Sequence, residues 1–352
     1  MLPARSASTS PRAHGGKPAG SLASAVWPGC WAYRRPAHGK RSRKPQQTLT
    51  PDDSALGYLF HTPGCELPVE LLDHAARLRK PVAVLDEGGL LEPAVVTRRS
   101  VPFAVFQTGV DVGPARAVAR YLLQIGHSRI AYVSAFHGAP WSVNRYRGLC
   151  ETYAEAGHAD GVSLHAAGSQ AYPGDYASGM VERHGLAAFL DSCDAAEKRF
   201  PLHHDRALET LRDSVVSRFV PEEIADRLAP VFERALADTT VTAWVCCNDP
   251  VALAALHYLK TVRQVVVPGR LSVVGFDNTL DAFSSDLTSY DFNIPAVVRA
   301  MIDFVIRPPR GPARPGGHVQ RIDGVLVERS STARCARWCE PDAALRSLLT
   351  QW

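Results

Sequence analysis

The stretch VTAWVCCNDP, residues 241–250, joins an apolar run directly to a polar pair and a proline. The run from 241 to 246 has the length and composition of a buried strand, and Asp249 followed by Pro250 is a typical start of a helix. The stretch LSVVGFDN, residues 271–278, repeats the pattern, because an apolar run again ends on a polar pair. Apolar strands separated by helices are typical of a parallel sheet that is covered on both faces. The two stretches therefore predict an α/β fold with doubly wound parallel sheets.

The same alternation extends outward from these stretches to about residue 54. We expect strands at 56–61, 81–85, 103–106 and 130–133. We expect the helices between and after the strands at 68–78, 114–125, 146–156 and 250–260. Gly126 and Gly157 end two of these helices, since glycine best tolerates the left-handed conformation of a helix terminus. Between 187 and 238 the alternation gives way to a charged helical stretch with one apolar stripe, formed by Leu208, Leu211, Val215, Val216 and Phe219. The charge on its other face indicates solvation.

Polar side chains follow the predicted strands at the points where the strands end. Asn248 and Asp249 come directly after one strand, and Asp277 and Asn278 come directly after the next. Open α/β sheets bind ligands at the carboxyl ends of their strands, where the chain reversal leaves a crevice. Arg145 comes shortly after an earlier strand, near the start of the helix that follows it. We therefore expect acid, amide and guanidinium groups to converge on one cleft.

This set of groups suits a sugar-like or otherwise polar small molecule. A carboxylate accepts hydrogen bonds, an amide both donates and accepts, and an arginine offers a rigid fork of donors. The aromatic side chains of Trp141 and Phe292 are candidates to cover the apolar face of a ring.

Each of these residues also has an interpretation without a ligand. Asp249 then only caps its helix, Asp277 only shapes a turn, and Arg145 lies on a solvated helix face. Asp111, in the loop at 108–113, either reaches the ligand or caps the next helix. The placement of several such groups at strand ends favours the binding site over the separate structural roles.

The net charge of +4 conceals two parts of the chain with opposite sign. Residues 1–50 carry nine basic side chains and no acid, which leaves −5 on the other 302 residues. Ser, Pro, Gly, Arg and Lys dominate this first segment, so it is predicted to be a disordered basic tail. Three specific interpretations of this tail are open: a basic arm for nucleic acid, an arginine-rich transit segment, and upstream sequence translated from a misplaced start. The solvated leader without a specific partner is the favoured interpretation.

Composition excludes several classes of protein. No run of about 18 apolar residues is present, so we expect no membrane-spanning helix. The best N-terminal apolar stretch, 21–33, is broken by Pro28 and Gly29, which argues against a signal peptide. Eight cysteines in a chain of this length do not form a dense disulfide framework, and the apolar setting of Cys246 and Cys247 predicts buried, reduced thiols in the cytoplasm.

The sequence offers no support for catalysis, a cofactor or a metal. It contains no nucleophile elbow G-x-S-x-G, no phosphate loop G-x-x-x-x-G-K-[ST] and no dinucleotide turn G-x-G-x-x-G. His203 and His204 are adjacent and have no acid or cysteine at ligand spacing, while Cys335 and Cys339 are too few for a zinc site. We expect a binding protein and not an enzyme.

Six short motifs carry a family resemblance. YLLQIGHSRIAYV at 121–133 is followed in order by RYRG, CND, VPGRLSVVGFDN, LTS and LVERSST, the last of which ends at Thr332. Together they resemble the effector-binding domain of the lactose-repressor/galactose-repressor family over roughly residues 54–332. The resemblance implies a periplasmic-binding-protein-like fold of two α/β lobes, joined by three crossovers, with the ligand between them.

The resemblance also implies roles for individual residues. Arg145 matches the ligand-contacting arginine of the family, Asn248 and Asp249 match its polar pair after a strand, and Asp277 matches the acid that holds sugar hydroxyls or a base. Members of the family are typically dimeric transcription regulators in which ligand-driven closure of the lobes changes the affinity for DNA.

Departures from the family pattern shape the expected domain organisation. Residues 1–50 lack the apolar period of the family's helix-turn-helix, and residues 56–60 resemble its third strand, so we expect an incomplete N-lobe. A basic tail is predicted at 1–50 and a C-terminal tail at 333–352. The N-lobe is predicted at 51–134 with 289–310. The C-lobe is predicted at 135–288 with 318–332, and it carries a helical insertion at 187–238.

The sequence thus predicts the ligand-sensing domain of a cytoplasmic transcription regulator. Its effector is a sugar, a nucleobase or another small polar molecule, it forms a homodimer, and it reaches DNA only through a reader that this chain does not contain. Two alternatives stay open, a solute-binding or sensor module that acts through a partner protein, and a truncated gene product without function.

Overall fold

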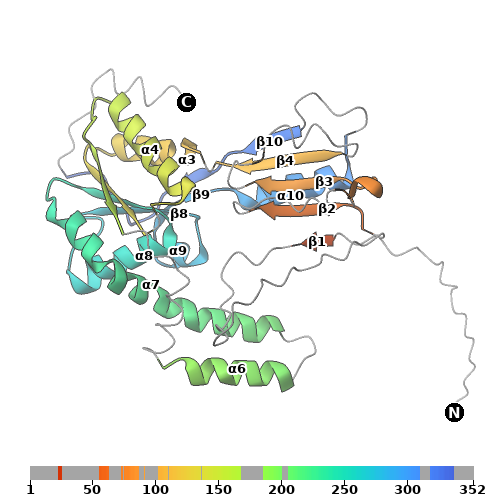
Figure 1. Ribbon diagram of the computed structural model, residues 1–352. Helices are drawn as coiled ribbons and strands as arrows, with labels where there is room; N and C mark the ends of the chain where they lie inside the picture. Colours follow the sequence, from red (N-terminus) through yellow and green to blue (C-terminus); the bar gives the residue numbers. More distant parts are fainter. Residues whose placement is uncertain are drawn as a thin grey trace, which may run out of the picture.

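The computed structural model contains two α/β lobes, each built on its own sheet (Figure 1). It describes residues 23–25, 55–62, 73, 75–86, 91, 102–109, 111–135, 137–167, 185–199, 205–309 and 318–336. None of the helices in these ranges has the length and hydropathy needed to span a bilayer.

The N-lobe sheet is entirely parallel in the described part of the chain. Its order is β1-β2-β3-β4-β10, with β1 at Ala23–Ala25, β2 at Tyr58–Thr62, β3 at Val82–Asp86, β4 at Phe103–Thr108 and β10 at His318–Ile322. Helix α10 (Ile294–Ile306) covers one face, where its Val297 and Phe304 pack against Leu85 and Phe106. The other face buries a second apolar cluster that includes Phe60, Val84 and Val105. Both faces of β3 and β4 are therefore buried, which explains their continuous apolar runs.

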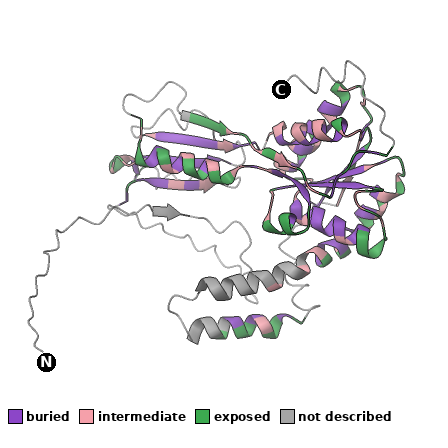
Figure 2. Ribbon diagram, turned by 180° about the vertical axis from the view of Figure 1, so that it is seen from behind, coloured by how far each residue is buried: buried purple, intermediate pink, exposed green. Residues whose placement is uncertain are grey.

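The C-lobe sheet has the order β11-β9-β8-β7-β5-β6. All pairs are parallel except that of β11 with β9, which is antiparallel. The strands are β5 (Ile130–Ser134), β6 (Val162–Ala166), β7 (Ala243–Cys246), β8 (Ser272–Phe276), β9 (Thr288–Asp291) and β11 (Val325–Val327). The helices around it are α3 (Gly113–Gln124), α4 (Pro140–Glu155), α8 (Asp249–His257) with the short π-helix η2 (Tyr258–Val262), and α9 (Leu280–Ser284). Figure 2 shows that burial is concentrated in the central strands and in the helix faces that cover them.

The charged stretch predicted at 187–238 forms two helices, α6 (Ala187–Arg199) and α7 (Asp205–Ala237), and α6 lies beside α7 away from both sheets (Figure 1). The last part of α7 belongs to the C-lobe core, where Phe232 stacks on Trp244 with ring centroids 5.7 Å apart. Val215 and Phe219 of the predicted stripe are half-buried. Leu208, Leu211 and Val216 lie on the described backbone of α7, but their side chains are not described.

In the described part of the chain, three segments pass between the lobes, as the resemblance implied. The first crossover, 109–112, joins β4 to α3; the second, 292–293, joins β9 to α10; and the third, 323–324, joins β10 to β11. The expected doubly wound α/β fold with two lobes is confirmed.

The predicted lobe boundaries were wrong at three places. Helix α3 and strand β5 belong to the C-lobe, because β5 pairs with β6 and β7. Strand β9 also pairs within the C-lobe, so the return to the N-lobe begins after Asp291, and β10 pairs with β4 in the N-lobe. A regular alternation of strands and helices does not say which of two sheets a strand joins.

A short strand lies inside the segment that composition predicts to be disordered. Ala23–Ala25 pairs in parallel with residues 58–60 of β2, so the expectation is wrong for these three residues. The rest of 1–50, the segment 337–352 and most of the predicted helix at 68–78 lie outside the described residues.

Candidate functional site

The carboxyl ends of both sheets face the space between the lobes. Strands β4, β9 and β10 each run directly into a crossover, so their carboxyl ends lie where the lobes meet. The neighbouring strands β3, β5, β7 and β8 are parallel to them and end at the same edges. Residues that follow these strands therefore meet between the lobes, where such folds bind their ligands.

Helix α4 positions Arg145 at this edge. The helix begins at Pro140, shortly after β5, and its first turn is tied to that strand by hydrogen bonds of the Ser142 hydroxyl with Tyr132 (2.8 Å) and Ser134 (2.9 Å). Arg145 lies one turn farther along and is only 7% exposed. Its Nη1 donates to the backbone oxygen of Cys247, at the end of β7.

Three aromatic rings surround the guanidinium of Arg145. Its Cζ lies 4.4 Å from the ring centroid of Phe276, 4.8 Å from that of Trp141 and 5.1 Å from that of Phe292. Ring faces attract a cation, and the attraction is strongest where water is excluded. The predicted aromatic residues Trp141 and Phe292 thus lie beside the predicted arginine, and sequence analysis did not single out Phe276.

Asp277 supplies the opposite charge. Its Oδ1 lies 3.8 Å from Arg145 Nη2, which is a charge interaction and longer than a hydrogen bond. The backbone of Asp277 has a φ of 111°, and its amide donates to the backbone oxygen of Tyr290 (2.9 Å). The Asp277 side chain remains 40% exposed, in contrast to the buried arginine. A carboxylate that solvent reaches beside a buried guanidinium can accept hydrogen bonds from a polar ligand.

Asn248 and Asp249 have different roles, although they are adjacent. Asn248 is half-buried and caps α8, because its Oδ1 accepts a hydrogen bond from the Val251 amide (3.1 Å). Asp249 is fully buried and ties α8 to strand β9 and to the start of α9. Its Oδ1 accepts from the Ser289 hydroxyl (2.6 Å), and its Oδ2 accepts from the Thr279 amide (2.8 Å) and hydroxyl (3.2 Å).

Burial raises the pKa of Asp249 to about 6. The hydrogen bonds from Ser289 and Thr279 and the charge of Arg329 oppose this shift but do not cancel it. The carboxylate that the sequence placed in the ligand site is thus occupied inside the C-lobe.

Asn278 is also engaged within the protein. Its Oδ1 accepts a hydrogen bond from Arg329 Nη2 (2.6 Å), its Nδ2 donates to Asp291 Oδ2 (3.0 Å), and its backbone amide donates to the Ser289 hydroxyl (3.0 Å). Both ends of the side-chain amide hold the turn after β8. The structure therefore separates Asn278 from its neighbour Asp277, whose carboxylate faces Arg145.

Asp111 lies in the first crossover and caps the helix that follows. Its Oδ1 accepts a hydrogen bond from the amide of Gly113 (2.9 Å), in the first turn of α3. Both of its oxygens also accept hydrogen bonds from Arg321. Burial works to raise the pKa of Asp111, but the hydrogen bonds from Arg321 and Gly113 outweigh burial and lower it. The hydrogen bond with Gly113 fits the structural role that the sequence offered for Asp111 at the start of α3.

Comparison with known proteins places this architecture in a family. The family model described as a periplasmic binding protein-like domain matches residues 119–332. The chain belongs to the periplasmic binding protein-like domain family. The match includes α4, the ends of β7 and β8 and the second crossover, which together carry Trp141, Arg145, Asn248, Asp277 and Phe292.

A curated relative and two solved structures are similar to this periplasmic binding protein-like domain. The relative is an HTH-type transcriptional regulator of Mycolicibacterium smegmatis, 25% identical over 207 residues, or 55% of this chain and 48% of the relative. The chain thus matches about half the length of that relative. A LacI family transcriptional regulator from Enterococcus faecium with bound ribose has 15% identity and a TM-score of 0.48, covering 80% of this chain and 81% of its own. A sugar-binding LacI family regulator from Escherichia coli, complexed with phosphate, has 17% identity and a TM-score of 0.47, covering 76% of this chain and 82% of its own.

Sequence analysis missed the N-lobe side of the interlobe edge of this domain. Asp86 ends β3, is 1% exposed, and accepts hydrogen bonds from the Leu91 amide (3.1 Å) and from Gln107 Nε2 (3.4 Å). The signal was present, because Asp86 follows the apolar run 82–85 as Asp277 follows its own strand.

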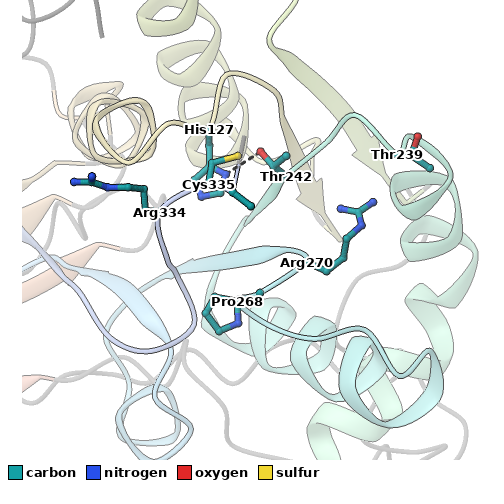
Figure 3. Close-up of a pocket in the computed structure, with 9 residues that line it drawn as sticks. His127, Thr239, Thr242, Pro268, Arg270, Arg334 and Cys335 are labelled. Carbon is teal, nitrogen blue, oxygen red and sulfur yellow. Dashed lines mark hydrogen bonds between the residues drawn. The ribbon is translucent and has the colours of Figure 1, made fainter. Parts of the chain in front are cut away.

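A small cavity lies at the opposite edge of the C-lobe sheet of the periplasmic binding protein-like domain (Figure 3). Its volume is about 120 Å³, and it is lined by residues near the starts of β5, β7 and β8 and after β11: His127, Thr239, Thr242, Pro268, Gly269, Arg270, Arg334, Cys335 and Ala336. Both ring nitrogens of His127 are occupied, by the Thr242 hydroxyl (2.8 Å) and the Ala333 oxygen (3.0 Å), and Arg334 extends away from them (Figure 3). This cavity is separate from the interlobe edge.

Metal binding finds no support in the described ranges, where no three His, Cys, Asp or Glu side chains gather in a group that could hold an ion. His203, His204 and Cys339, which the sequence analysis considered, lie outside those ranges.

Proposed function

We propose that this domain binds a sugar-like or other small polar molecule between its lobes, as the ligand-sensing part of a transcription regulator. The observation that carries the proposal is the buried Arg145, enclosed by three rings at the interlobe edge with the accessible carboxylate of Asp277 beside it. A buried charge is costly unless it is paired, so this arrangement requires a reason beyond packing. We call Arg145, Asp277, Asn248, Trp141 and Phe292 the interlobe site.

The chemistry of the interlobe site suits a ring that carries hydroxyl groups. Asp277 accepts hydrogen bonds, Arg145 donates them, and the faces of Trp141 and Phe292 offer an apolar surface to the flat side of the ring. Asp86 ends β3 at the N-lobe side of this edge, but its buried carboxylate is held by Leu91 and Gln107, so we leave it out of the interlobe site. A nucleobase, which combines ring faces with donors and acceptors, fits the same set of groups.

We infer a regulatory and non-enzymatic role. Support comes from the relative in M. smegmatis, whose name describes an HTH-type transcriptional regulator. A ligand that bridges two lobes favours their closed arrangement, and it shifts the equilibrium only as far as it prefers that state. Closure that is linked to ligand would then change how an associated DNA reader binds.

We place this function in the cytoplasm. The cysteines of the described residues, Cys150, Cys193, Cys246, Cys247 and Cys335, are free thiols. Four of them are buried, as expected for small apolar side chains in a reducing compartment.

We expect the domain to form a homodimer through α9. Leu280 and Phe283 on this helix are 78% and 65% exposed, which is a high exposure for large apolar side chains close to each other. Sedimentation velocity should show a dimer for the wild type and a monomer for the double variant Leu280→Lys, Phe283→Lys. The control is Val319→Lys, at an exposed apolar residue of β10, which should remain dimeric. A wild-type monomer, or a dimer that survives the double substitution, would contradict this interface.

Titration calorimetry tests the ligand site. The wild type and Asp277→Asn should be titrated with a panel of pentoses, hexoses, disaccharides and nucleobases. We expect at least one compound to bind the wild type and to bind Asp277→Asn about 10-fold to 100-fold more weakly, because a hydrogen bond to a charged acceptor contributes about 1.5 to 3 kcal/mol. The variant keeps the size of the side chain and removes only its charge.

Asp160→Asn is the matched control for this titration. Asp160 is an exposed acid just before β6, at the edge of the sheet away from the interlobe site, so its substitution should leave affinity unchanged. Equal binding by the wild type and Asp277→Asn would contradict the assignment of Asp277 to the ligand site. A wild type that binds none of the compounds would contradict the proposed class of ligand.

A further inference from the structure

Arg321 connects two of the three crossovers. It is the second-last residue of β10, where it pairs in register with Gln107 of β4, and it therefore belongs to the N-lobe sheet. Its Nη1 and Nη2 donate to the two oxygens of Asp111 in the first crossover, with a separation of 3.0 Å between Nη2 and Oδ1. Its Nε donates to Asp323 Oδ1 (2.8 Å) in the third crossover. All three guanidinium nitrogens thus donate hydrogen bonds to residues of the crossovers.

The first of these contacts reaches the C-lobe. Asp111 Oδ1 also accepts the hydrogen bond from the Gly113 amide, which begins α3. Helix α3 packs against α4, and α4 carries Arg145 and Trp141 of the interlobe site. A continuous path of hydrogen bonds and packed helices therefore leads from the N-lobe strand β10 to the interlobe site.

The backbone around this contact is shaped for the guanidinium. A Cβ on Gly113 would lie 2.7 Å from Arg321 Nη2 and 3.0 Å from Asp111 Oδ1, so any side chain at this position would displace the ion pair. Glycine is otherwise unfavourable inside a helix, since it loses more backbone freedom than alanine. The space left by Gly113 is occupied by the Arg321 guanidinium.

We propose that Arg321 is a positioning residue that clasps the first crossover to the third and so holds α3 and α4 in a fixed relation to the N-lobe. The consequence for ligand binding rests on the proposed function, but the clasp itself does not. With two crossovers pinned together, the lobes rotate about one point and cannot slide past each other. The interlobe site then keeps its geometry through opening and closure.

The geometry sets this pair apart from ordinary surface ion pairs. Exposed pairs usually contribute little, because water and salt screen them. Here the contact is bidentate, a second carboxylate holds Nε, and Gly113 fixes one acceptor oxygen by its own hydrogen bond. Bidentate arginine–carboxylate pairs add geometric specificity as well as attraction.

Hydrogen–deuterium exchange of the full chain without ligand tests the clasp. The amides of Gly113 and Gly324 report on the two crossovers, because Gly324 donates to the Tyr290 hydroxyl beside the third (3.1 Å). We expect Arg321→Gln to speed exchange in the peptides that contain these two amides by about tenfold, as local opening becomes easier. Peptides from the buried strand β7 should be unchanged, which separates loosening of the crossovers from general unfolding.

Asp111→Asn separates the ion pair from the helix cap. Asparagine keeps an oxygen for the Gly113 amide but loses the charge that Arg321 binds, so this variant should match Arg321→Gln. The double variant should add nothing further, because both substitutions break the same contact. Arg321→Lys keeps the charge without the fork and should restore only part of the protection. High salt should speed exchange in the wild type and leave Arg321→Gln unaffected.

Arg263→Gln is the matched control, because it removes an arginine–carboxylate contact of similar exposure, that of Arg263 with Glu233 (3.0 Å), away from the crossovers, and it should leave exchange at both crossovers at the wild-type rate. Wild-type exchange rates at both crossovers in Arg321→Gln and in Asp111→Asn would overturn the proposal, as would fully additive effects in the double variant. Calorimetry with the same panel of compounds then keeps the two proposals apart. Altered exchange in a protein that binds none of them would leave the clasp standing and refute the ligand proposal alone.

Discussion

Gly275→Ala is expected to lower the free energy of unfolding by about 3 kcal/mol or more. A Cβ at this position of β8 would overlap Asp249 Oδ1 and lie 3.1 Å from Leu287 Cδ2 and 3.2 Å from Ala252 Cβ. Overpacking a core costs about 1 to 3 kcal/mol, and displacing a buried hydrogen-bonded carboxylate adds to that cost. The central strand and α8 cannot both move away, because each is fixed by its own neighbours in the sheet and core.

Urea unfolding at neutral pH measures this effect. Gly138→Ala is the matched control, because a Cβ there would meet no heavy atom within 4 Å. Gly138→Ala should unfold with nearly the wild-type midpoint and Gly275→Ala at a clearly lower urea concentration. Equal midpoints for the two variants would show that Asp249 does not need the space beside β8.

The buried carboxylate of Asp249 should also make stability depend on pH. Its pKa is about 6 in the folded protein, against 3.8 for the free side chain, so the folded state binds the proton more tightly than the unfolded state. The contribution is therefore fully present below about pH 4 and is lost as the pH rises through about 6. The difference in pKa corresponds to about 3 kcal/mol of unfolding free energy.

Comparison with Asp249→Asn isolates this contribution from other titrating groups. Asparagine retains an oxygen for the Thr279 amide and does not titrate, while the Ser289 hydroxyl can rotate to accept a hydrogen bond. Between about pH 4 and pH 6.5 the stability of the wild type should fall relative to Asp249→Asn by about 2 kcal/mol. Asp160→Asn, at an exposed acid, should follow the wild type throughout. Parallel curves for the wild type and Asp249→Asn would mean that burial does not hold the proton on Asp249.

The elements of the site followed from the sequence, whereas the direction of its side chains did not. Asp277 and Asn278 look equivalent as a polar pair after a strand, but both adopt left-handed backbone conformations, with φ of 111° and 49°. The turn leaves Asp277 beside Arg145 and directs Asn278 to Arg329 and Asp291. Such a turn depends on partners far along the chain, and spacing alone cannot predict them.

The same limit explains the errors in the lobe boundaries. The pattern of β10, HVQRI, is that of a short half-buried strand and fits the edge of either sheet. It pairs with β4 and not with a C-lobe strand, and its Arg321 contacts Asp111, a residue 210 positions earlier that the local pattern does not reveal. Asp86, in contrast, could have been found by applying to the N-lobe the rule that identified Asp277.

The three crossovers bear on how the molecule is made. The N-lobe sheet takes β2, β3 and β4 from one part of the chain and β10, at His318–Ile322, from near its other end. Domains formed from one continuous segment can fold in turn as they leave the ribosome. Here the N-lobe sheet still lacks its last strand when almost the whole C-lobe has been synthesised. Neither sheet is therefore complete before β10 and β11 have been synthesised, and neither lobe can be expressed alone by cutting the gene at a single point.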